Sequence, residues 1–201
     1  MRPHHIERVL FPADAIAGRV RDLASAIARS SSEPDICLIG ILRGSFVFLA
    51  DLIRCFHLHR LRPRLDFMLL QSYGRGTESS GEIRVLRDFD LDIRGRDTLI
   101  VDDILDTGRT LAFAADRARE RGAARVRTCV LLDKPSRRAV PISADFAAFT
   151  CPDEFVVGYG LDYDSLYRDL PWIAAVTFTD TGPATNAAGD SRPAPLKEVP
   201  R

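Results

Sequence analysis

The chain has 201 residues, of which 46% are hydrophobic and 28% charged, and its 28 basic and 28 acidic side chains leave no net charge at pH 7. This length suits a single α/β domain, which buries about 70% of the surface that its unfolded chain exposes. The balanced charge argues against a nucleic-acid partner and against binding to an anionic membrane. Any recognition of phosphate by this chain must therefore be local.

Periodic apolar residues predict helices and strands that alternate along the chain. The expected helices cover residues 14–28, 45–53 and 111–121, and the expected strands cover 36–42, 65–70, 83–86, 99–101, 126–132 and 173–178, with short strands near Phe146 and Phe155. This alternation predicts an α/β fold with a mostly parallel, twisted sheet and helices on both faces. Ligands of such sheets sit at the carboxyl ends of the strands, and the polar motifs of this chain follow its strands.

Two segments depart from this alternation. Residues 73–81 are rich in Gly and Ser, and as a long loop between two strands they are a candidate flexible lid. Residues 181–201 are rich in Pro, Ala and Gly with little apolar periodicity. We therefore expect a disordered tail after a single domain that covers residues 1–180.

The cysteines and the N-terminal segment indicate the compartment, whereas the histidines bear on metal binding. The four cysteines form no Cys-x-x-Cys pair and are interpreted as small apolar residues of a reducing compartment. Residues 1–20 carry charges throughout, and no apolar stretch approaches the length that spans a membrane. We therefore expect a soluble, cytoplasmic protein. The histidines lack metal-ligand spacing and are predicted to lie at the surface (His4, His5, His57 and His59).

The most informative pattern is residues 98–110, Thr-Leu-Ile-Val-Asp-Asp-Ile-Leu-Asp-Thr-Gly-Arg-Thr. Its β-branched apolar run predicts a buried strand that ends in two adjacent carboxylates, Asp102 and Asp103. A turn that contains Asp106 and Gly108 follows, and a helix is expected after it. The sequence thus places an acidic pair beside the N-terminus of a helix.

This arrangement predicts a phosphate site with hydroxyl-binding carboxylates beside it. The first N–H groups of a helix have no partners within the helix, and the helix dipole adds positive potential there. Gly108 allows close approach of the backbone, Thr107 and Thr110 supply hydroxyls, and Arg109 supplies a positive charge. The plainer alternative is a strand–turn–helix junction with a capping Asp and Thr.

Three further motifs follow predicted strands. Arg43 and Gly44 precede a helix, in an exposed turn that suits a diphosphate. Lys134, one of only two lysines among the 28 basic residues, supplies a compact amine where the chain otherwise uses arginine. Phe155 offers a face to a planar base, and Val156 offers backbone groups to the edge of that base. The plainer interpretation of the Arg43–Gly44 turn is a simple connection. That of Lys134 is a solvated polar turn, and that of Phe155 is a core aromatic residue.

Asp162 and Arg168 follow the glycines of this last motif. Asp162 is a candidate ligand of a hard cation, and Arg168 a candidate phosphate contact, although a surface Asp and Arg often have no role. No G-x-G-x-x-G fingerprint follows a strand. The glycine spacing of residues 76–81 is that of a P-loop, but Glu82 stands where the lysine is required, which excludes an ATPase site. The triplet 106–108 matches that of aspartic proteases, but a single copy at a strand–helix turn excludes that class.

Together the motifs resemble the type I phosphoribosyltransferases, and among them the bacterial-type hypoxanthine (hypoxanthine-guanine) enzymes of purine salvage. The resemblance covers about residues 9–176. It rests on Leu-Arg-Gly, Ser-Tyr-Gly, Ile-Val-Asp-Asp-Ile-Leu-Asp-Thr-Gly, Leu-Leu-Asp-Lys-Pro-Ser-Arg-Arg and Pro-Asp-Glu-Phe-Val-Val-Gly-Tyr-Gly-Leu-Asp-Tyr, in this order. The main departure is Asp102, where many members have Glu.

The resemblance implies transfer of a 5-phosphoribosyl group from 5-phosphoribosyl-1-pyrophosphate (PRPP) to N9 of hypoxanthine or guanine, which gives IMP or GMP and pyrophosphate. It further implies Mg²⁺ as cofactor, a homodimer or homotetramer, and a small hood region beside the main sheet. Asp106 is implied as the general base and Lys134 as the donor to the 6-oxo group.

The implied site residues fall into five groups. PRPP is contacted by Asp102, Asp103, Asp106, Thr107, Gly108, Arg109 and Thr110. Pyrophosphate is held by Arg43, Gly44 and Arg168; the purine by Lys134, Phe155, Val156 and Asp162; and the metal by Asp102, Asp103 and Asp162. Ser72 and Tyr73 match the signature of the flexible catalytic loop.

A PRPP-sensing regulator is the competing hypothesis, because the same fold can bind PRPP without turnover. The chain has no basic appendage that would bind DNA. The Arg43–Gly44 turn, Asp106 and the base-binding segment also favour an enzyme.

Overall fold

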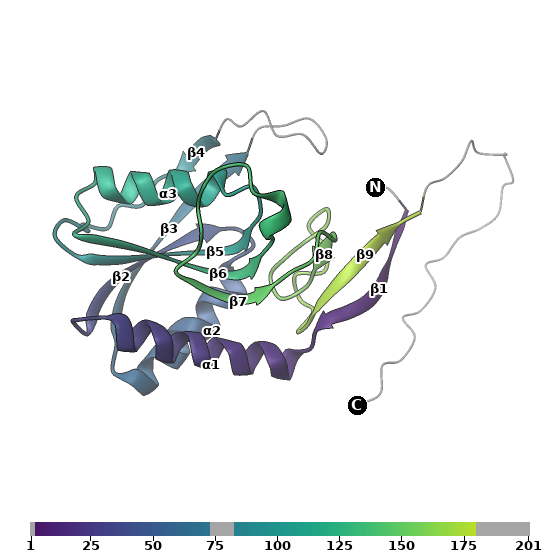
Figure 1. Ribbon diagram of the computed structural model, residues 1–201, viewed down its shortest axis with the longest axis horizontal. Helices are drawn as coiled ribbons and strands as arrows, with labels where there is room; N and C mark the ends of the chain where they lie inside the picture. Colours follow the sequence, from purple (N-terminus) through teal and green to yellow (C-terminus); the bar gives the residue numbers. More distant parts are fainter. Residues whose placement is uncertain (1–2, 73–82, 180–201) are drawn as a thin grey trace, which may run out of the picture.

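The computed structural model describes residues 3–72 and 83–179 and consists, within those ranges, of two sheets, three α-helices and two short 3₁₀ helices, labelled η (Figure 1). The main sheet has six strands in the order β4-β3-β2-β5-β6-β7, and the small sheet has the order β1-β9-β8. In chain order the elements are β1 (His4–Phe11), α1 (Ala13–Ser30), β2 (Asp35–Leu42), α2 (Phe46–Phe56), η1 (His57–His59), β3 (Arg62–Ser72), β4 (Ile83–Arg87), β5 (Asp97–Leu105), α3 (Arg109–Glu120), β6 (Arg125–Asp133), η2 (Pro135–Arg137), β7 (Phe146–Thr150), β8 (Val156–Val157) and β9 (Ile173–Phe178).

The main sheet is parallel except for β4, which pairs antiparallel with β3. Successive residues of β2 point to opposite faces of the sheet: Leu38 belongs to the core under α1 and α2, whereas Cys37 and Ile39 belong to the core under α3. Figure 1 shows the same layers, with α1 and α2 on one face and α3 on the other. The predicted α/β fold is confirmed.

The strand order brings motifs far apart in the sequence to one edge. β5 lies between β2 and β6, with Gly40 opposite Val101 and Leu105 opposite Asp133. Since all three strands run in the same direction, the residues that follow them share the carboxyl edge of the sheet. The turn at Arg43, the acidic pair and Lys134 therefore converge.

The small sheet forms a hood, which we define as β1, β9 and β8 together with residues 158–170, the hood loop. The sequence predicted β9 and a strand near Phe155, but it did not predict β1. β1 pairs antiparallel with β9, with His4 opposite Phe178. Most of its residues are half-buried or exposed, so its apolar pattern is weak. Its partner lies more than 160 residues away, and no local signal reports such a pairing.

The observed elements correct two further expectations. β5 extends to Leu105, so the acidic pair lies within the strand and not after it. The surface prediction holds only in part for His4, which is half-buried: its Nε2 lies 2.8 Å from the Tyr167 hydroxyl, and its ring packs edge-on against Tyr163 at 4.7 Å. The other three histidines are exposed, and all four cysteines are free thiols.

The predicted lid at 73–81 and the predicted tail at 181–201 lie outside the described residues. Within the described ranges, no helix is long and apolar enough to cross a membrane.

A buried arginine joins the first helix to the main sheet. Arg127 on β6 has only 2% of its surface exposed. Its guanidinium contacts both oxygens of the Asp97 carboxylate at 3.0 and 2.7 Å and donates to the Ser30 and Ser31 hydroxyls at 2.6 and 2.9 Å. The charge is thus paired and its donors are used, as burial requires.

We expect Arg127→Met to lower the free energy of unfolding by about 3–5 kcal/mol, because it leaves the largely buried Asp97 carboxylate without its partner. Urea denaturation measures this change. The control is Arg119→Met, which removes an exposed ion pair with Asp116 and should cost less than about 1 kcal/mol. Equal effects of the two variants would contradict the importance of the buried network.

Candidate active site

The acidic pair on β5 combines a buried carboxylate, Asp102, with a half-buried one, Asp103. Asp102 is 5% exposed, and its Oδ1 accepts a hydrogen bond of 2.9 Å from the Asp103 N–H. The Asp103 Oδ1 accepts one of 2.7 Å from the Ile104 N–H. Burial raises the pKa of Asp102 well above its usual value, and the neighbouring Asp103 charge raises it further. Burial also raises the pKa of Asp103, against hydrogen bonds and the nearby Arg168 charge.

Three segments meet at Gly44. A Cβ atom added to Gly44 would lie 1.5 Å from the Asp103 Oδ2, so the carboxylate rests directly on this backbone. A Cβ atom added to Gly160 would lie 2.4 Å from the Gly44 carbonyl oxygen. The turn after β2, the acidic pair on β5 and the hood loop are therefore packed within contact distance. The peptide bond between Leu42 and Arg43, at the start of this turn, is cis.

The predicted phosphate turn begins where β5 ends, and α3 starts at Arg109. Gly108 has φ +85°, and a Cβ atom there would lie 2.5 Å from Ile142 Cγ2. Glycine is thus required by left-handed backbone and by packing against residues 138–142, which the sequence did not indicate. The Thr107 hydroxyl faces the Arg109 N–H at 3.5 Å, at the first turn of the helix. The turn has the local form predicted for an anion site.

Asp106 is the first residue of this turn, directly after β5. Its Oδ1 lies 2.8 Å from Arg137 Nε in an ion pair. The same oxygen is buried and, within the described part of the chain, receives no hydrogen bond of good geometry. A carboxylate oxygen in this state retains the capacity to accept a proton from a ligand.

Lys134 and Phe155 form the next part of the site. Lys134 is 6% exposed, and its Nζ donates to the Glu154 carbonyl at 2.6 Å, so it is not part of a solvated turn. Phe155 is 43% exposed and is therefore not a core aromatic residue. Tyr163 and Phe178 hold its ring edge-on, with centroids 5.6 and 5.3 Å away. Val156 follows at the start of β8 and is buried.

Asp162 and Arg168 are joined in the hood loop. The Asp162 Oδ1 pairs with Arg168 Nη2 at 2.6 Å, and its Oδ2 accepts from the Ser165 N–H at 2.8 Å. Arg168 Nη1 also donates to the Gly160 carbonyl at 2.6 Å. Non-glycine residues with positive φ gather in this loop, at Tyr159, Asp164, Ser165 and Tyr167. Such backbone strain is often stored at functional sites.

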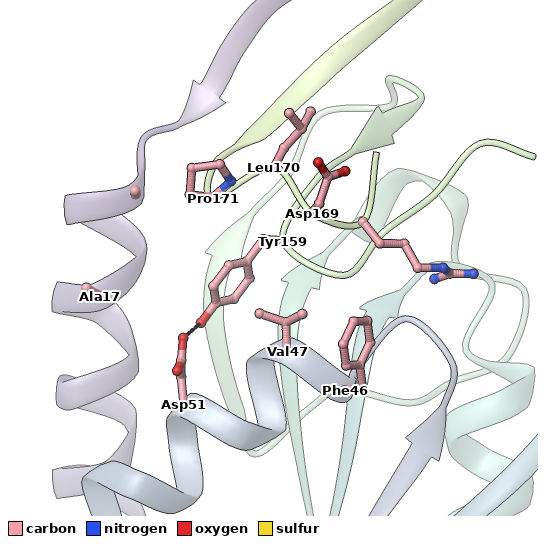
Figure 2. Close-up of a pocket in the computed structure, with 10 residues that line it drawn as sticks. Ala17, Phe46, Val47, Asp51, Tyr159, Asp169, Leu170 and Pro171 are labelled. Atoms are coloured by element: carbon pink, nitrogen blue, oxygen red, sulfur yellow. Dashed lines mark hydrogen bonds between the residues drawn. The ribbon is translucent and has the colours of Figure 1, made fainter. Parts of the chain in front are cut away.

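A cavity of about 630 Å³ lies between α1, α2 and the hood loop (Figure 2). Of the predicted site residues only Arg168 lines it. Figure 2 shows the Tyr159 hydroxyl reaching Asp51 on α2, a hydrogen bond of 2.8 Å. Burial and the Asp51 carboxylate raise the pKa of Tyr159. This bond joins the loop that carries Asp162 to α2, the helix that follows Gly44. The sequence indicated no role for Tyr159 or Asp51.

The carboxylates do not form a metal cage of their own. Among residues 3–72 and 83–179, no three His, Cys, Asp or Glu side chains converge as ligands. Asp102 and Asp103 form one group, whereas Asp162 is engaged by Arg168. The predicted donors are carboxylate oxygens, the protein ligands that Mg²⁺ takes together with substrate phosphates and water.

Comparison with known proteins assigns the chain to a family. The model of the phosphoribosyl transferase domain matches residues 10–164. The hypoxanthine phosphoribosyltransferase of Escherichia coli K12 is 43% identical over 178 residues, which cover 88% of this chain and 98% of that protein. The hypoxanthine-guanine phosphoribosyltransferase of Bacillus subtilis 168 is 42% identical over 176 residues, or 88% and 96% of the two chains.

Solved structures indicate the same family. The hypoxanthine phosphoribosyltransferase of Trypanosoma cruzi in complex with its product IMP superimposes with a TM-score of 0.79 and 38% identity, over 86% of this chain and 95% of that one. The chain therefore belongs to the phosphoribosyl transferase family. Within it, the chain falls among the hypoxanthine and hypoxanthine-guanine phosphoribosyltransferases, which are enzymes of purine salvage.

The raised pKa of Asp102 makes stability depend on pH. Folding strengthens proton binding at Asp102, so this contribution is complete below the unfolded pKa of about 4 and is lost as the pH rises through the higher folded value. We expect Asp102→Asn, which never ionises, to exceed the wild type in unfolding free energy at pH 8. Each unit of pKa shift corresponds to about 1.4 kcal/mol.

Urea denaturation at pH 4.5, 6 and 8 measures the difference, which should shrink toward acid pH. The exposed Asp22→Asn serves as the control for replacing a carboxylate. A difference between Asp102→Asn and the wild type that does not vary with pH would contradict the assignment.

Proposed function

We propose that the chain transfers the 5-phosphoribosyl group of PRPP to N9 of hypoxanthine or guanine, forming IMP or GMP and releasing pyrophosphate. One observation supports this most directly. The buried acidic pair rests on the Gly44 backbone, and Asp106 and Lys134 follow at the ends of β5 and β6. Hydroxyl acceptors, phosphate-binding backbone, a proton acceptor and a donor to an oxo group are thus joined at one sheet edge.

PRPP carries two phosphate-bearing ends, and the site offers a place for each. The turn from Asp106 to Thr110 faces the 5-phosphate with the N-terminus of α3, the threonine hydroxyls and Arg109. Asp102 and Asp103 accept hydrogen bonds from the ribose hydroxyls. Pyrophosphate lies against the turn of Arg43 and Gly44, with Arg168 as a further contact, which requires Arg168 to leave Asp162.

The residues fit a magnesium ion that is shared with the substrate. Asp102 and Asp103 supply hard carboxylate oxygens whose charge is costly when buried without a partner. Asp162 supplies another once Arg168 has moved. Bound there, Mg²⁺ would neutralise the charge of the leaving pyrophosphate.

The purine is held by its faces and edges. Phe155, which is 43% exposed, stacks on the ring, and the Val156 backbone meets the ring edge. Lys134 donates to the 6-oxo group, because its ammonium is buried and already directed toward the Glu154 carbonyl beside Phe155. Adenine carries an amino group at that position, which cannot accept this hydrogen bond, so it is disfavoured.

Asp106 accepts the purine ring proton as N9 bonds to the sugar carbon and the bond to pyrophosphate breaks. The sugar passes through an oxocarbenium-like state, which must be kept from water. The predicted catalytic loop would exclude that water. Its Ser72 is the last residue of β3, whereas Tyr73 and the rest of the loop lie outside the described residues, so this role stays a prediction.

The proposed function is tested by incubating the protein with PRPP and Mg²⁺ and one purine at a time. We expect IMP and GMP with hypoxanthine and guanine and no product with adenine. Lys134→Met should lower kcat/KM for hypoxanthine about 10–100-fold, the cost of removing one charged hydrogen bond. Binding of PRPP without product from any base would contradict the proposal and favour the PRPP-sensing regulator.

The role of Asp106 is tested separately. We expect Asp106→Asn to lower kcat by roughly 10²–10⁴-fold, as for the loss of a general base, with PRPP affinity retained. Steady-state rates and calorimetric titration with PRPP and Mg²⁺ measure the two effects. An unchanged rate would remove Asp106 from this role.

A further inference from the structure

We propose that Arg137 is a positioning residue for Asp106, and that Asp153 in turn holds Arg137. The inference rests on the proposed function, in which Asp106 accepts the purine proton. Arg137 belongs to the motif Leu-Leu-Asp-Lys-Pro-Ser-Arg-Arg, but the sequence indicated no role for it.

The geometry places Arg137 between two carboxylates. Its Nε lies 2.8 Å from the Asp106 Oδ1, and its Nη1 donates to the Asp153 Oδ1 at 3.1 Å. The hydrogen bond to Asp153 orients the planar guanidinium, and the ion pair then holds the Asp106 carboxylate beside it, although this second contact lacks good hydrogen-bond geometry. The hydrogen bond to Asp153 and the Asp106 charge raise the pKa of Arg137, so its charge is permanent.

The segment that carries Arg137 also holds the backbone of Asp106. Arg138 Nη1 donates to the carbonyls of Leu105 and Asp106 at 2.9 and 2.6 Å. The Ala139 N–H donates to the Thr107 carbonyl at 2.9 Å. Asp106 is therefore fixed at its side chain and its main chain by residues 137–139, which come from the next strand connection.

The same segment includes the residue that recognises the purine in our proposal. The Lys134 N–H donates to the Leu105 carbonyl at 3.0 Å. Residues 134–139 thus connect the donor to the 6-oxo group with the acceptor of the ring proton. Both groups must meet one rigid ligand, and Arg137 is the member of this segment that sets the direction of the Asp106 carboxylate.

This role differs from a contribution to stability. Arg137 and Asp106 have side chains that are 40% and 39% exposed, and ion pairs of this exposure contribute at most about 1 kcal/mol to folding. Without Arg137 the Asp106 carboxylate is free to occupy other rotamers, and the productive one is populated less often. The loss is therefore expected in the chemical step and not in the folded state.

The test is steady-state kinetics of Arg137→Met with hypoxanthine, PRPP and Mg²⁺. We expect kcat to fall about tenfold, with KM for PRPP within a factor of two of the wild type and the melting temperature unchanged. Arg137→Lys should restore part of kcat, because the ammonium keeps the charge but lacks the fork. Asp153→Asn should lower kcat less than Arg137→Met, and the double variant should be no slower than Arg137→Met alone.

Arg119→Met is the matched control, an arginine of a helix-surface ion pair with Asp116 that should leave kcat unchanged. Wild-type kcat in Arg137→Met, with Asp106→Asn still impaired, would overturn the inference and leave the proposed function intact. A lowered melting temperature without rescue of kcat by Arg137→Lys would show a structural role and also overturn it. Failure of the wild type to form any nucleotide would instead refute the proposed function.

Discussion

The contact of the Asp103 carboxylate with the backbone of Gly44 constrains the rest of the site. Any side chain at residue 44 would occupy the space of this carboxylate, and the carbonyl of the same residue leaves no room for a side chain at Gly160. Two glycines thus allow three segments to close on one point. This closure places the acidic pair, the turn after β2 and the hood loop within contact distance of one another.

The closure is possible because the sheet is parallel at its centre. Side by side, β2, β5 and β6 end at one edge, and each contributes a different chemical group there. The price in free energy is the burial of two adjacent carboxylates, which raises the pKa of both. A fold selected for stability alone would replace them, since well-packed apolar residues avoid this cost. In the proposed function, ligand hydroxyls and a cation offset this cost.

The hood and the segment 134–139 complete the site from outside the sheet edge. Phe155 directly precedes β8 and packs against Tyr163 and Phe178 of the hood, whereas the segment carries Lys134 and fixes Asp106. Tyr159 joins the hood loop to α2 through Asp51. Lys134 Nζ donates to the Glu154 carbonyl and Arg137 pairs with Asp153, so this segment and the residues just before β8 hold each other in place. Such supporting contacts keep the side chains of a site in fixed relative positions.

The sequence alone determined the α/β class, most helix and strand positions, and the identity of the acidic pair and the turn after it, because these depend on local periodicity and residue type. It did not determine β1 or the position of His4, since both follow from pairing with a strand near the other end of the chain. Nor did it reveal why Gly108 is a glycine, or that Arg137 contacts Asp106. These contacts join residues that lie 30 to 34 positions apart in the sequence, and only the packing of one strand connection against another brings them together.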